Sequence, residues 1–542
     1  MIKKIFCLLM SVSMLFLFSA CGEGGVDANI YFPIDNDPLY LDPQVVSDPG
    51  AKNIIANCFE GLVTVDSEGR IAPGTAERWE ISDDSLTYTF YLRKDCKWAI
   101  MSAASGFLGE NFREEFDSRV TAHDFVFGMR RALLPETLSP GAKNLFSIKN
   151  AQLVNSGALP SDRLGVKAVD DYTLTITLTQ ADPDFLYVLL EPECMPCNQK
   201  FFEATGGRYG LSTRFLMYNG PFYMSNWADD SSITLMKNDD YYDYENVKPY
   251  SIYFSINDEQ DTRLDKITDE IYDIAPLTAE QAEELSGKRG YTVTSFDSST
   301  YCLAFNCKNE ALSNLNLRKA IASSFDRELF YSFLGQSSVK GILPSSMLLS
   351  GTKYRDGAGS LTLDIKAQSK ELFEKSLTEL DLDHIELTVL CTEREEEAVR
   401  NIMQKWQASL GVKFNVFIEI STRNEIGSRL SDGGDWQIAF TDISFSHLTA
   451  FNGLLQFTSD SSENVIGFSD KTFDRLVGAI KTTSGIKESI ESTKRAEQYL
   501  LDQCALIPLY DAPVYYGLGK GVQNVRFNTT GDIVYFRDAI VK

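Results

Sequence analysis

Apolar and polar residues follow two different periods along the chain, and each period predicts a different kind of element. In "SLTYTFYLRKDCKW" (85–98) they alternate one by one, which indicates a strand with one buried face. "GVKAVDDYTLTITLTQ" (165–180) alternates in the same way around an Asp-Asp pair and predicts a hairpin. "RVTAHDFVFGMRRAL" (119–133) has helical spacing, and Thr121 followed by Asp124 is a start signal for that helix. The first half of the chain therefore combines hairpin strands with helices.

From residue 290 onward, strands alternate with longer helices. The predicted strands are "TYCLAFNC" (300–307), "HIELTVLCT" (384–392) and "VKFNVFIEI" (412–420), and helices are predicted at 315–334 and 393–409. Strands that alternate with helices of about ten or more residues are typical of βαβ units. We therefore expect a lobe with a largely parallel sheet in this half.

The first twenty residues have the pattern of a targeting signal. Lys3 and Lys4 precede an apolar stretch of 14 residues that ends at Phe18, too short to span a bilayer comfortably. The small residues before Cys21 resemble a bacterial lipoprotein box, in which Cys21 carries the lipid; an ordinary secretory cleavage is the alternative. Residues 21–27 form a Gly-rich tether. The expectation is an extracytoplasmic body that a lipid anchors to the cell membrane.

Length and charge narrow the possibilities further. A chain of 542 residues exceeds the roughly 250–300 residues over which one core usually grows, so two or three lobes are expected. Apolar residues make up 44% of the chain, which excludes a disordered protein. The formal charge of −25 and the lack of a basic run exclude nucleic acid as a partner. A solvated acidic surface is enough to explain this net charge, so the charge does not indicate which ligand the protein binds.

No recognisable catalytic or metal-binding motif is present. The sequence has no GxSxG, HExxH, Walker-type or GxGxxG pattern, and only three histidines. "CMPC" (194–197) has no second CxxC to complete a zinc site, which leaves a local disulfide, a redox pair or buried thiols as its interpretations. Cys302 and Cys307 fall on opposite faces of a strand and are not expected to pair. We expect no enzyme activity, no cofactor and no metal.

The order of the motifs resembles one family, the extracytoplasmic solute-binding proteins of oligopeptide and dipeptide ABC transporters (bacterial extracellular solute-binding protein family 5). The resemblance spans almost the whole mature chain in the right order. It is carried by "LYLDP" (39–43), the stretch from "CFEGLVTV" to "YLRKDCKW" (58–98), "RVTAHDFVFGMRRAL", "GVKAVDDYTLTITL", "YNGPFYM" (218–224), "LRKAIASSFDRELF" (317–330) and "AEQYLLDQCALIPLY" (496–510).

This resemblance implies an α/β fold of the periplasmic-binding-protein type, class II, with two main α/β lobes joined by a hinge and an extra third lobe. The insertion after Trp98 then lies in the second lobe as a surface embellishment. The implied division is a signal peptide 1–20, a tether 21–27, a discontinuous first lobe 28–60 with 181–298 and 512–542, a second lobe 61–180, and a third lobe 299–511.

The family's function implies that the first and third lobes close over a peptide and deliver it to an ABC permease with its ATPase subunits. A peptide is held in extended form by its own backbone, with charge partners for its two termini. A monomer is the family expectation. Two alternatives stay open: the same fold binding a non-peptide solute such as a metal complex or a sugar, and a receptor for peptide signals.

Several ligand contacts follow from positions in the family pattern. The loop Val46-Ser47-Asp48 lies where the first lobe meets the ligand. Tyr301 and Tyr510 resemble aromatic residues that line the cleft near the hinge, with hinge packing as the alternative. Arg355 either pairs with a ligand carboxylate or is solvated.

The stretch "DWQIAFTDISFSHLTAF" (435–451) departs from the family pattern, and its candidate ligand contacts are Trp436, Asp442, Ile443 and Ser446. Members usually have a Trp followed by Ala-Asp-Tyr and an Asp-Pro, and that Asp receives the peptide α-ammonium. Here Ile443 takes the Trp position and Ser446 the Asp position. Asp442 is displaced by four residues, so it is either an ammonium anchor in a shifted register or a turn or cap residue.

Overall fold

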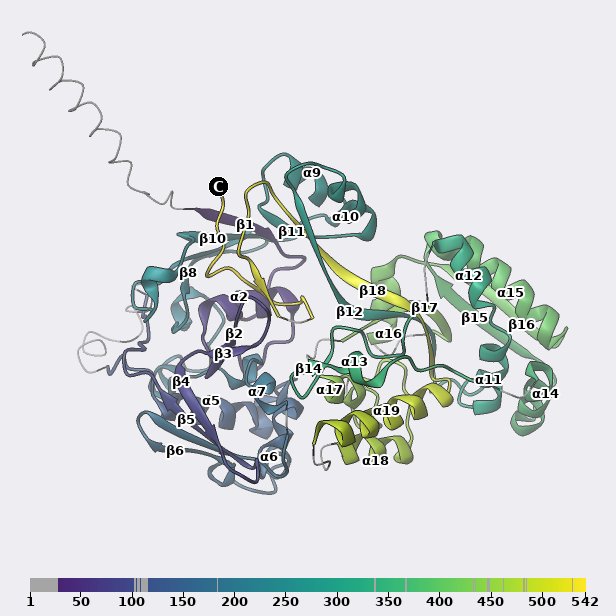
Figure 1. The fold of residues 1–542 in the computed structure, drawn as a ribbon, viewed down its shortest axis with the longest axis horizontal. Coiled ribbons are helices and arrows are strands. Elements are labelled where there is room, and N and C mark those ends of the chain that lie inside the picture. Colours follow the sequence, from purple (N-terminus) through teal and green to yellow (C-terminus); the bar gives the residue numbers. More distant parts are fainter. Residues whose placement is uncertain are drawn as a thin grey trace, which may run out of the picture.

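The computed structural model describes residues 28–542 with several short gaps, and it arranges them around three β-sheets (Figure 1). We call the parts built on these sheets the first, second and third lobes. The signal segment, the tether, Cys21, Ser446 and much of the insertion after Trp98 lie outside the described residues. The gaps are 102–103, 105–107, 109–115, 183, 336–337, 366–367, 432, 434, 446–448, 462, 481–482, 484 and 529.

The first lobe is built on a four-stranded sheet in the order β1-β10-β9-β8, in which only β1 and β10 are parallel. Alternation along β1 buries Ile30 and Phe32 against helix α2 and the C-terminal segment. Helix α2 begins where it does because Asp48 Oδ1 accepts the Ala51 N–H at 2.7 Å and Pro49 follows directly. The elements are β1 (Asn29–Pro33), α2 (Pro49–Cys58), α8 (Gln199–Ala204), β8 (Phe222–Ala228), β9 (Ser232–Lys237), β10 (Ser251–Ser255), β19 (Arg526–Phe527) and β20 (Val534–Tyr535).

The second lobe contains the predicted hairpin and the predicted strand at 85–98 in one antiparallel sheet, in the order β4-β5-β7-β6. Both predictions are confirmed. Nearby are the short strands β2 and β3, which pair only with each other. The elements are β2 (Val63–Val65), β3 (Ile71–Pro73), β4 (Ala76–Ile81), β5 (Thr87–Leu92), α5 (Ala122–Ala132), α6 (Ala151–Asn155), β6 (Val166–Asp170), β7 (Thr173–Thr177) and α7 (Phe185–Val188).

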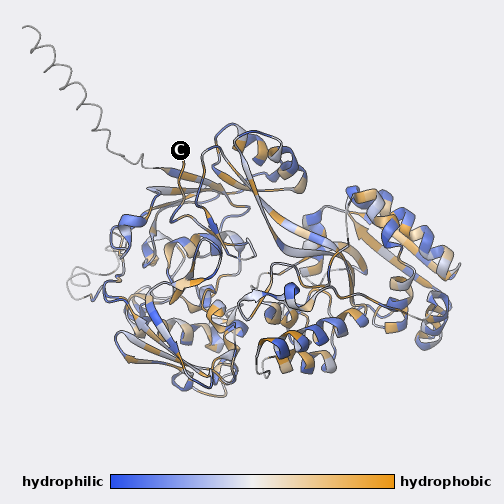
Figure 2. Ribbon diagram, viewed as in Figure 1, coloured by the Kyte–Doolittle hydropathy of each residue, from blue (hydrophilic) through white to orange (hydrophobic). Residues whose placement is uncertain are grey.

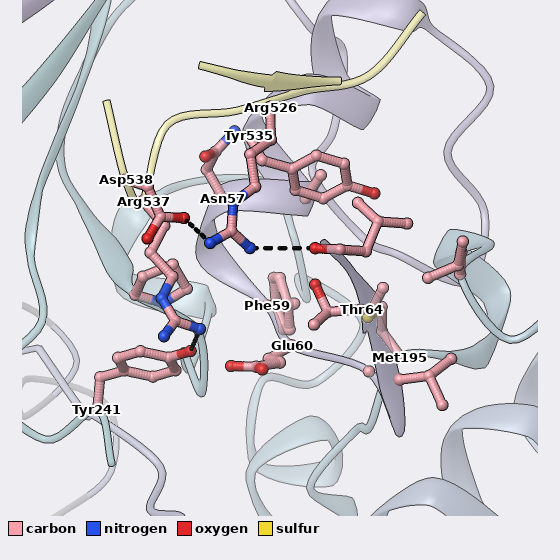
Figure 3. A pocket seen from close by; sticks show the side chains of 16 residues that line it. Asn57, Phe59, Glu60, Thr64, Met195, Tyr241, Arg526, Tyr535, Arg537 and Asp538 are labelled. Atoms are coloured by element: carbon pink, nitrogen blue, oxygen red, sulfur yellow. Dashed lines mark hydrogen bonds and ion pairs between the residues drawn. The ribbon is translucent and has the colours of Figure 1, made fainter. Parts of the chain in front are cut away.

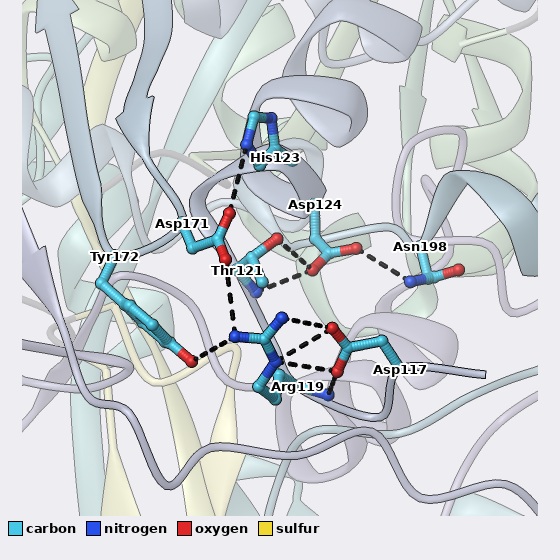
Figure 4. A network of polar contacts seen from close by, with 8 residues as sticks. All are labelled: Asp117, Arg119, Thr121, His123, Asp124, Asp171, Tyr172 and Asn198. Carbon is cyan, nitrogen blue, oxygen red and sulfur yellow. Dashed lines mark hydrogen bonds and ion pairs between the residues drawn. The ribbon is translucent and has the colours of Figure 1, made fainter. Parts of the chain in front are cut away.

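Helix α5 starts at the predicted signal, and Figure 4 shows the polar network around that start. The Thr121 N–H donates to Asp124 Oδ2 at 2.8 Å, and Asn198 Nδ2 donates to the other oxygen at 3.1 Å. Burial raises the pKa of Asp124 to about 6, although these hydrogen bonds oppose the shift. Arg119 contacts Asp171 at 3.4 Å, which joins the hairpin turn to the segment before the helix.

A buried ion pair joins the second lobe to the first. Arg131, near the end of α5, donates from Nη1 to Asp42 Oδ2 at 2.7 Å, and both residues are at most 6% exposed. The guanidinium also stacks over the rings of Phe202 and Tyr209. Because the pair lies in the interior, neither charge is compensated by solvent if its partner is removed.

The third lobe is built on a six-stranded sheet in the order β11-β18-β12-β17-β15-β16. The prediction of a largely parallel sheet is wrong: β15 runs parallel to β16 and to β17, whereas the other three contacts are antiparallel. The reason is that β12 and β18 are long neighbouring strands of opposite direction in the middle of the sheet. The strands are β11 (Ile274–Leu277), β12 (Thr292–Phe305), β15 (Ile385–Cys391), β16 (Phe414–Ile420), β17 (Ile438–Ser444) and β18 (Leu506–Leu518), with the small pair β13 (Leu348–Leu349) and β14 (Thr352–Lys353).

Helices cover both faces of this sheet, and along them hydrophilic blue and hydrophobic orange alternate in Figure 2. The single helix predicted at 315–334 is two helices, because Asp326 Oδ1 accepts the Leu329 N–H at 3.0 Å and begins a second one. The helices are α9 (Arg263–Thr268), α10 (Ala279–Ser286), α11 (Leu315–Ser323), α12 (Arg327–Leu334), α13 (Tyr354–Ala358), α14 (Ser369–Leu380), α15 (Glu396–Leu410), α16 (Arg423–Ser431), α17 (Ala450–Leu455), α18 (Lys471–Ile480) and α19 (Ile486–Asp502).

All eight cysteines in the described part of the chain are free, and seven of them are buried. Of the three interpretations of "CMPC", the structure therefore favours buried thiols, and Cys302 and Cys307 do not pair with each other. Over the same described residues, no helix combines the length and the apolar character that crossing a membrane requires.

Candidate functional site

The three lobes meet beside strands β12 and β18, and a cavity of about 320 Å³ lies at this junction. We call it the inner cavity. Its volume falls in the range of small-ligand sites, roughly 300–1,000 Å³. It is lined by Val46, Ser47, Pro49, Lys52, Asp532 and Ile533 of the first lobe, Pro140, Gly141 and Asn144 of the second, Glu193 of the segment between them, Ser444, Phe445 and Glu463 of the third, and Ser298, Ser299 and Val514 of the two long strands.

The floor of the inner cavity coincides with an irregularity in strand β12. Its pairing with β18 shifts register between Phe296 and Ser299, so that two residues of β12, Asp297 and Ser298, stand opposite one residue of β18. Ser298 lies in the bulge; its carbonyl accepts the Phe445 N–H at 3.1 Å, but its buried hydroxyl has no hydrogen-bond partner among the described residues. The bulge thus points a buried polar group at the junction of the lobes.

The predicted contact loop of the first lobe reaches this cavity in part. Val46 and Ser47 line it. Asp48 is half-buried, and its side chain is engaged as the N-cap of α2. The loop is therefore placed by the start of the helix, because the residue that caps α2 also fixes the two residues before it.

Asp442 and the two predicted tyrosines form one cluster next to the inner cavity. Asp442 lies within β17 opposite Tyr301, and its Oδ2 contacts Arg423 Nη1 at 2.8 Å. The rings of Tyr301 and Tyr510 stack with centroids 4.5 Å apart, and the Arg423 guanidinium lies 5.8 Å from the Tyr301 ring. The interpretation of Asp442 as a turn or cap residue is therefore wrong, because it sits in a strand and pairs with an arginine.

The cluster shares a face of the sheet with two cavity residues. Ser444 pairs with Ser299 and lies two positions after Asp442, so both serines and Asp442 are on the same face. Burial raises the pKa of Asp442, and the opposite charge of Arg423 lowers it. Asp442 itself is not among the residues that line the inner cavity.

Arg355 is not solvated; it is 4% exposed and forms a buried ion pair. Its Nη1 donates to Glu497 Oε2 at 3.0 Å, and its Nη2 donates to the Leu343 carbonyl at 2.7 Å. Glu497 also accepts the Ile342 and Leu343 N–H groups. The ion pair thus fixes the backbone at residues 342–343, in the segment that follows α12.

The two remaining predicted residues in the described part, Trp436 and Ile443, belong to the core of the third lobe. Trp436 is 4% and Ile443 2% exposed, and neither lines the inner cavity. Ser446, which was predicted to take the position of an ammonium-binding acid, lies outside the described residues.

Sequence reasoning missed four charged residues that the fold brings to the inner cavity: Lys52, Glu193, Glu463 and Asp532. They are far apart in the chain, and in the sequence Glu463 and Asp532 look like ordinary loop acids. One available signal was Gly141, where an added Cβ would clash with the Glu193 carboxylate. A glycine is required there so that the carboxylate can approach the backbone.

Two other cavities differ in character from the inner one. A larger one of about 630 Å³ lies beside residues 294–297 of β12, between the turn at Glu68 and the β13–β14 pair. A small one of about 40 Å³, shown in Figure 3, lies between the first lobe and strand β2, beside Glu60, Tyr241 and Arg526. The small one has room for little more than a water molecule, so it is not a site for a solute.

Within the described residues there is also no group of three or more His, Cys, Asp or Glu side chains that could hold a metal ion. What the inner cavity offers is hydrogen bonding and charge: serine hydroxyls, an amide, one ammonium and three carboxylates.

Comparison with known proteins identifies related chains over most of this length. The model for bacterial extracellular solute-binding proteins, family 5 (Middle) matches residues 70–464. The dipeptide-binding protein DppE of Bacillus subtilis is 27% identical over 497 residues, covering 89% of this chain and 86% of DppE. The oligopeptide-binding protein OppA of the same organism is 28% identical over 569 residues, covering 98% and 99%.

Solved structures agree with this relationship. The substrate-binding domain of an oligopeptide ABC transporter from Bacillus anthracis superposes with a TM-score of 0.75 at 28% identity, covering 95% of this chain and 98% of that one. The α/β multi-lobe fold expected from the sequence is thereby confirmed.

Proposed function

Because the chain belongs to the bacterial extracellular solute-binding proteins, family 5, we propose that it captures peptides between its lobes and delivers them to an ABC importer. The family consists of binding proteins, and we propose no catalytic role for any residue. Peptides are proposed as the ligand class because the named relatives are dipeptide- and oligopeptide-binding proteins.

The observation that carries this proposal is that all three lobes line one cavity beside the two strands that connect them. A ligand in such a cavity touches every lobe at once, so it favours the arrangement in which the lobes are together. This geometry suits capture and release by lobe movement.

We further propose that Cys21 carries a lipid anchor and that the mature protein works outside the membrane as a monomer. These points rest on the sequence pattern of the first 27 residues and on the family resemblance. Radiolabelled palmitate incorporation into the wild type and into Cys21→Ala tests the anchor; equal incorporation into both overturns it.

Of the predicted ligand contacts, we propose Val46 and Ser47 as direct ones, because they line the inner cavity. We propose that Asp48, Trp436 and Ile443 hold the walls. The cluster of Asp442, Tyr301 and Tyr510 borders the inner cavity along β17. We propose that Arg423, which pairs with Asp442, is the residue at this border that contacts a ligand long enough to reach it.

Thermal unfolding of the mature protein with and without a mixed peptide pool tests the proposed function. A ligand at 100 times its dissociation constant adds about 2.7 kcal/mol to the free energy of unfolding, which is easily seen as a shift in Tm. Mass spectrometry of the retained material identifies the ligand. No shift and no retained peptide would overturn the peptide assignment.

Two outcomes separate the alternatives. Retention of a sugar or a metal complex in place of a peptide would show that this protein uses the same fold to bind another class of solute. Normal peptide uptake in a deletion strain, together with loss of a response to peptides, would favour a receptor for peptide signals over a transport component.

A further inference from the structure

We propose that the second lobe holds the third lobe in the arrangement in which the lobes are together, which we call closed, and thereby sets how tightly the protein retains its ligand. This inference rests on the proposed function and adds residues that regulate capture at that same site. It is carried by the packing of Tyr187, in α7 of the second lobe, against Leu348, in β13 of the third. We call these two side chains and their apolar neighbours the clasp.

The clasp is an apolar cluster between two lobes. Tyr187 is 8% and Leu348 6% exposed, and their side chains pack together. Ile71 of β3 and Leu190, which follows α7, pack against them from the side of the second lobe. Because Leu348 comes from the third lobe, the burial of these side chains depends on the two lobes being together.

A backbone contact places the third-lobe side of the clasp. The Gly351 N–H, in the turn between β13 and β14, donates to Asp184 Oδ1 at 3.2 Å, and Asp184 directly precedes α7. An added Cβ at Gly351 would lie 3.9 Å from the Tyr187 hydroxyl oxygen, so the turn packs directly on this side chain. The turn between β13 and β14 therefore reaches from the third lobe onto the second.

The same two lobes also touch close to the inner cavity. Lys143 Nζ of the second lobe donates to the Asp460 carbonyl of the third. Lys143 stands two positions after Gly141 and Asp460 three before Glu463, and both of these neighbours line the inner cavity. The side chains of the clasp and Lys143 are not among the residues that line it. Their effect on a ligand there is therefore exerted through the position of the lobes.

The clasp is coupled to the movement that opens the inner cavity. The buried pair of Arg131 and Asp42 joins the second lobe to the first, so movement of the third lobe away from this unit also separates Tyr187 from Leu348. Opening then exposes apolar side chains to water, which is unfavourable. The clasp therefore favours the closed form whether or not a ligand is bound.

A link between closure and affinity follows from this coupling. The apparent dissociation constant equals the intrinsic one divided by the fraction of molecules in the binding-competent form. A weaker clasp lowers the closed fraction of the ligand-free protein, so it weakens binding by the same factor. Tyr187 and Leu348 also line the larger cavity, where a ligand would touch them directly. Measurement on the ligand-free protein separates these two effects.

Small-angle X-ray scattering of the ligand-free mature protein measures the closed fraction. Tyr187→Ala should lower the ratio of closed to open molecules about tenfold, because it removes most of the apolar contact. Leu348→Glu should lower this ratio about a hundredfold, because it places a charge that only the closed form buries. The concentration of a mixed tri- to hexapeptide pool that gives half of the maximal rise in Tm should increase by the factor by which the closed fraction falls.

Three further variants test the specificity of the effect. Tyr187→Phe keeps the ring and should restore the wild-type closed fraction. Lys143→Ala should lower the ratio of closed to open molecules by about threefold, since an exposed polar contact is weak. Leu382→Glu is the matched control and should change nothing: Leu382 is 42% exposed and follows α14, at the end of the third lobe that is remote from the second (Figure 1).

A closed fraction that neither Tyr187→Ala nor Leu348→Glu lowers in the ligand-free protein would overturn the inference. Weaker peptide binding without such a change would also overturn it, because these side chains would then act on the ligand directly. If Leu348→Glu does not fold, Tyr187→Ala on the other lobe decides the question. If no peptide raises the Tm of the wild type, the proposed function fails, whereas scattering of the ligand-free variants still decides whether the clasp holds the lobes.

Discussion

At the scale of single residues, the carboxyl groups near the long strands have environments that their neighbours in sequence do not reveal. Asp511 of β18 illustrates this: burial raises its pKa to about 6, and the nearby charge of Asp297 adds to the shift, whereas Arg355 and Lys340 oppose it. Its Oδ1 is buried and has no hydrogen-bond partner in the described part of the chain. Ionised Asp511 is therefore destabilised in the folded protein relative to the unfolded chain.

Asp511→Asn should stabilise the protein at neutral pH. Because the folded pKa lies above the ordinary value, the wild type loses stability as pH rises from about 4 to about 6 and keeps that loss above it. The free energy of unfolding of the variant should exceed that of the wild type by about 1–2 kcal/mol at pH 7.5, and the two should be equal at pH 3.5. Urea unfolding of both proteins at the two pH values measures this; a gain that is equal at both would contradict it.

The pair of Arg423 and Asp442 gives a second residue-scale test. Arg423→Ala should cost about 1–3 kcal/mol, because it leaves a largely buried carboxylate without its cation. Adding Asp442→Asn should restore most of the loss. Arg429→Ala, on the same helix α16 but in a surface pair with Glu419, should cost less than about 1 kcal/mol. Additive losses in the double variant would show that the two side chains are not coupled.

At the scale of elements, boundaries are set by capping residues and by close approaches of the backbone. The sequence predicted α5 from Thr121 and Asp124, and the hairpin from its alternation, because these signals are local. It missed the break at Asp326, where an acid that looks like part of an amphipathic helix begins a new one. It also missed that β12 and β18 pair over their whole length, since that pairing depends on residues about 200 positions apart.

The approach of Glu193 to Gly141 is an element-scale feature that one methyl group tests. Gly141→Ala should displace the Glu193 carboxylate, weaken ligand binding and cost about 1–3 kcal/mol of stability. Gly427→Ala is the control, because its added Cβ contacts no other atom. Replacing this glycine inside helix α16 with alanine should raise the free energy of unfolding by up to about 1 kcal/mol. Calorimetric Tm values and a peptide titration report both effects; unchanged binding in Gly141→Ala would contradict the placement of Glu193.

At the scale of the whole molecule, the family resemblance predicted the multi-lobe α/β fold, but it did not predict which charged residues line the inner cavity. Val46 and Ser47 follow from position in a motif. Lys52 and Asp532 of the first lobe lie near Glu463 of the third only because these lobes come together, and no local pattern marks residues whose neighbours in space lie several hundred positions away. Asp442 was conspicuous in the sequence, yet the fold turns it toward Arg423.

The buried pair of Arg131 and Asp42 is expected to hold the first two lobes as a unit. Arg131→Met should cost about 3–5 kcal/mol, because it leaves Asp42 buried and charged. Combining it with Asp42→Leu should recover a large part of that loss. Denaturant unfolding of the single and double variants measures the coupling, and a loss below about 1 kcal/mol in the single variant would contradict a structural role for the pair.

The burial of the cysteines has a practical consequence for following lobe movement. Thiolates react with maleimides and thiols do not, and burial raises the pKa of every cysteine in the described part, including half-buried Cys307. One cysteine introduced on the surface of each lobe should therefore take up fluorophores selectively while the native thiols remain in place. The distance between two such dyes would report opening and closing in an otherwise unaltered protein.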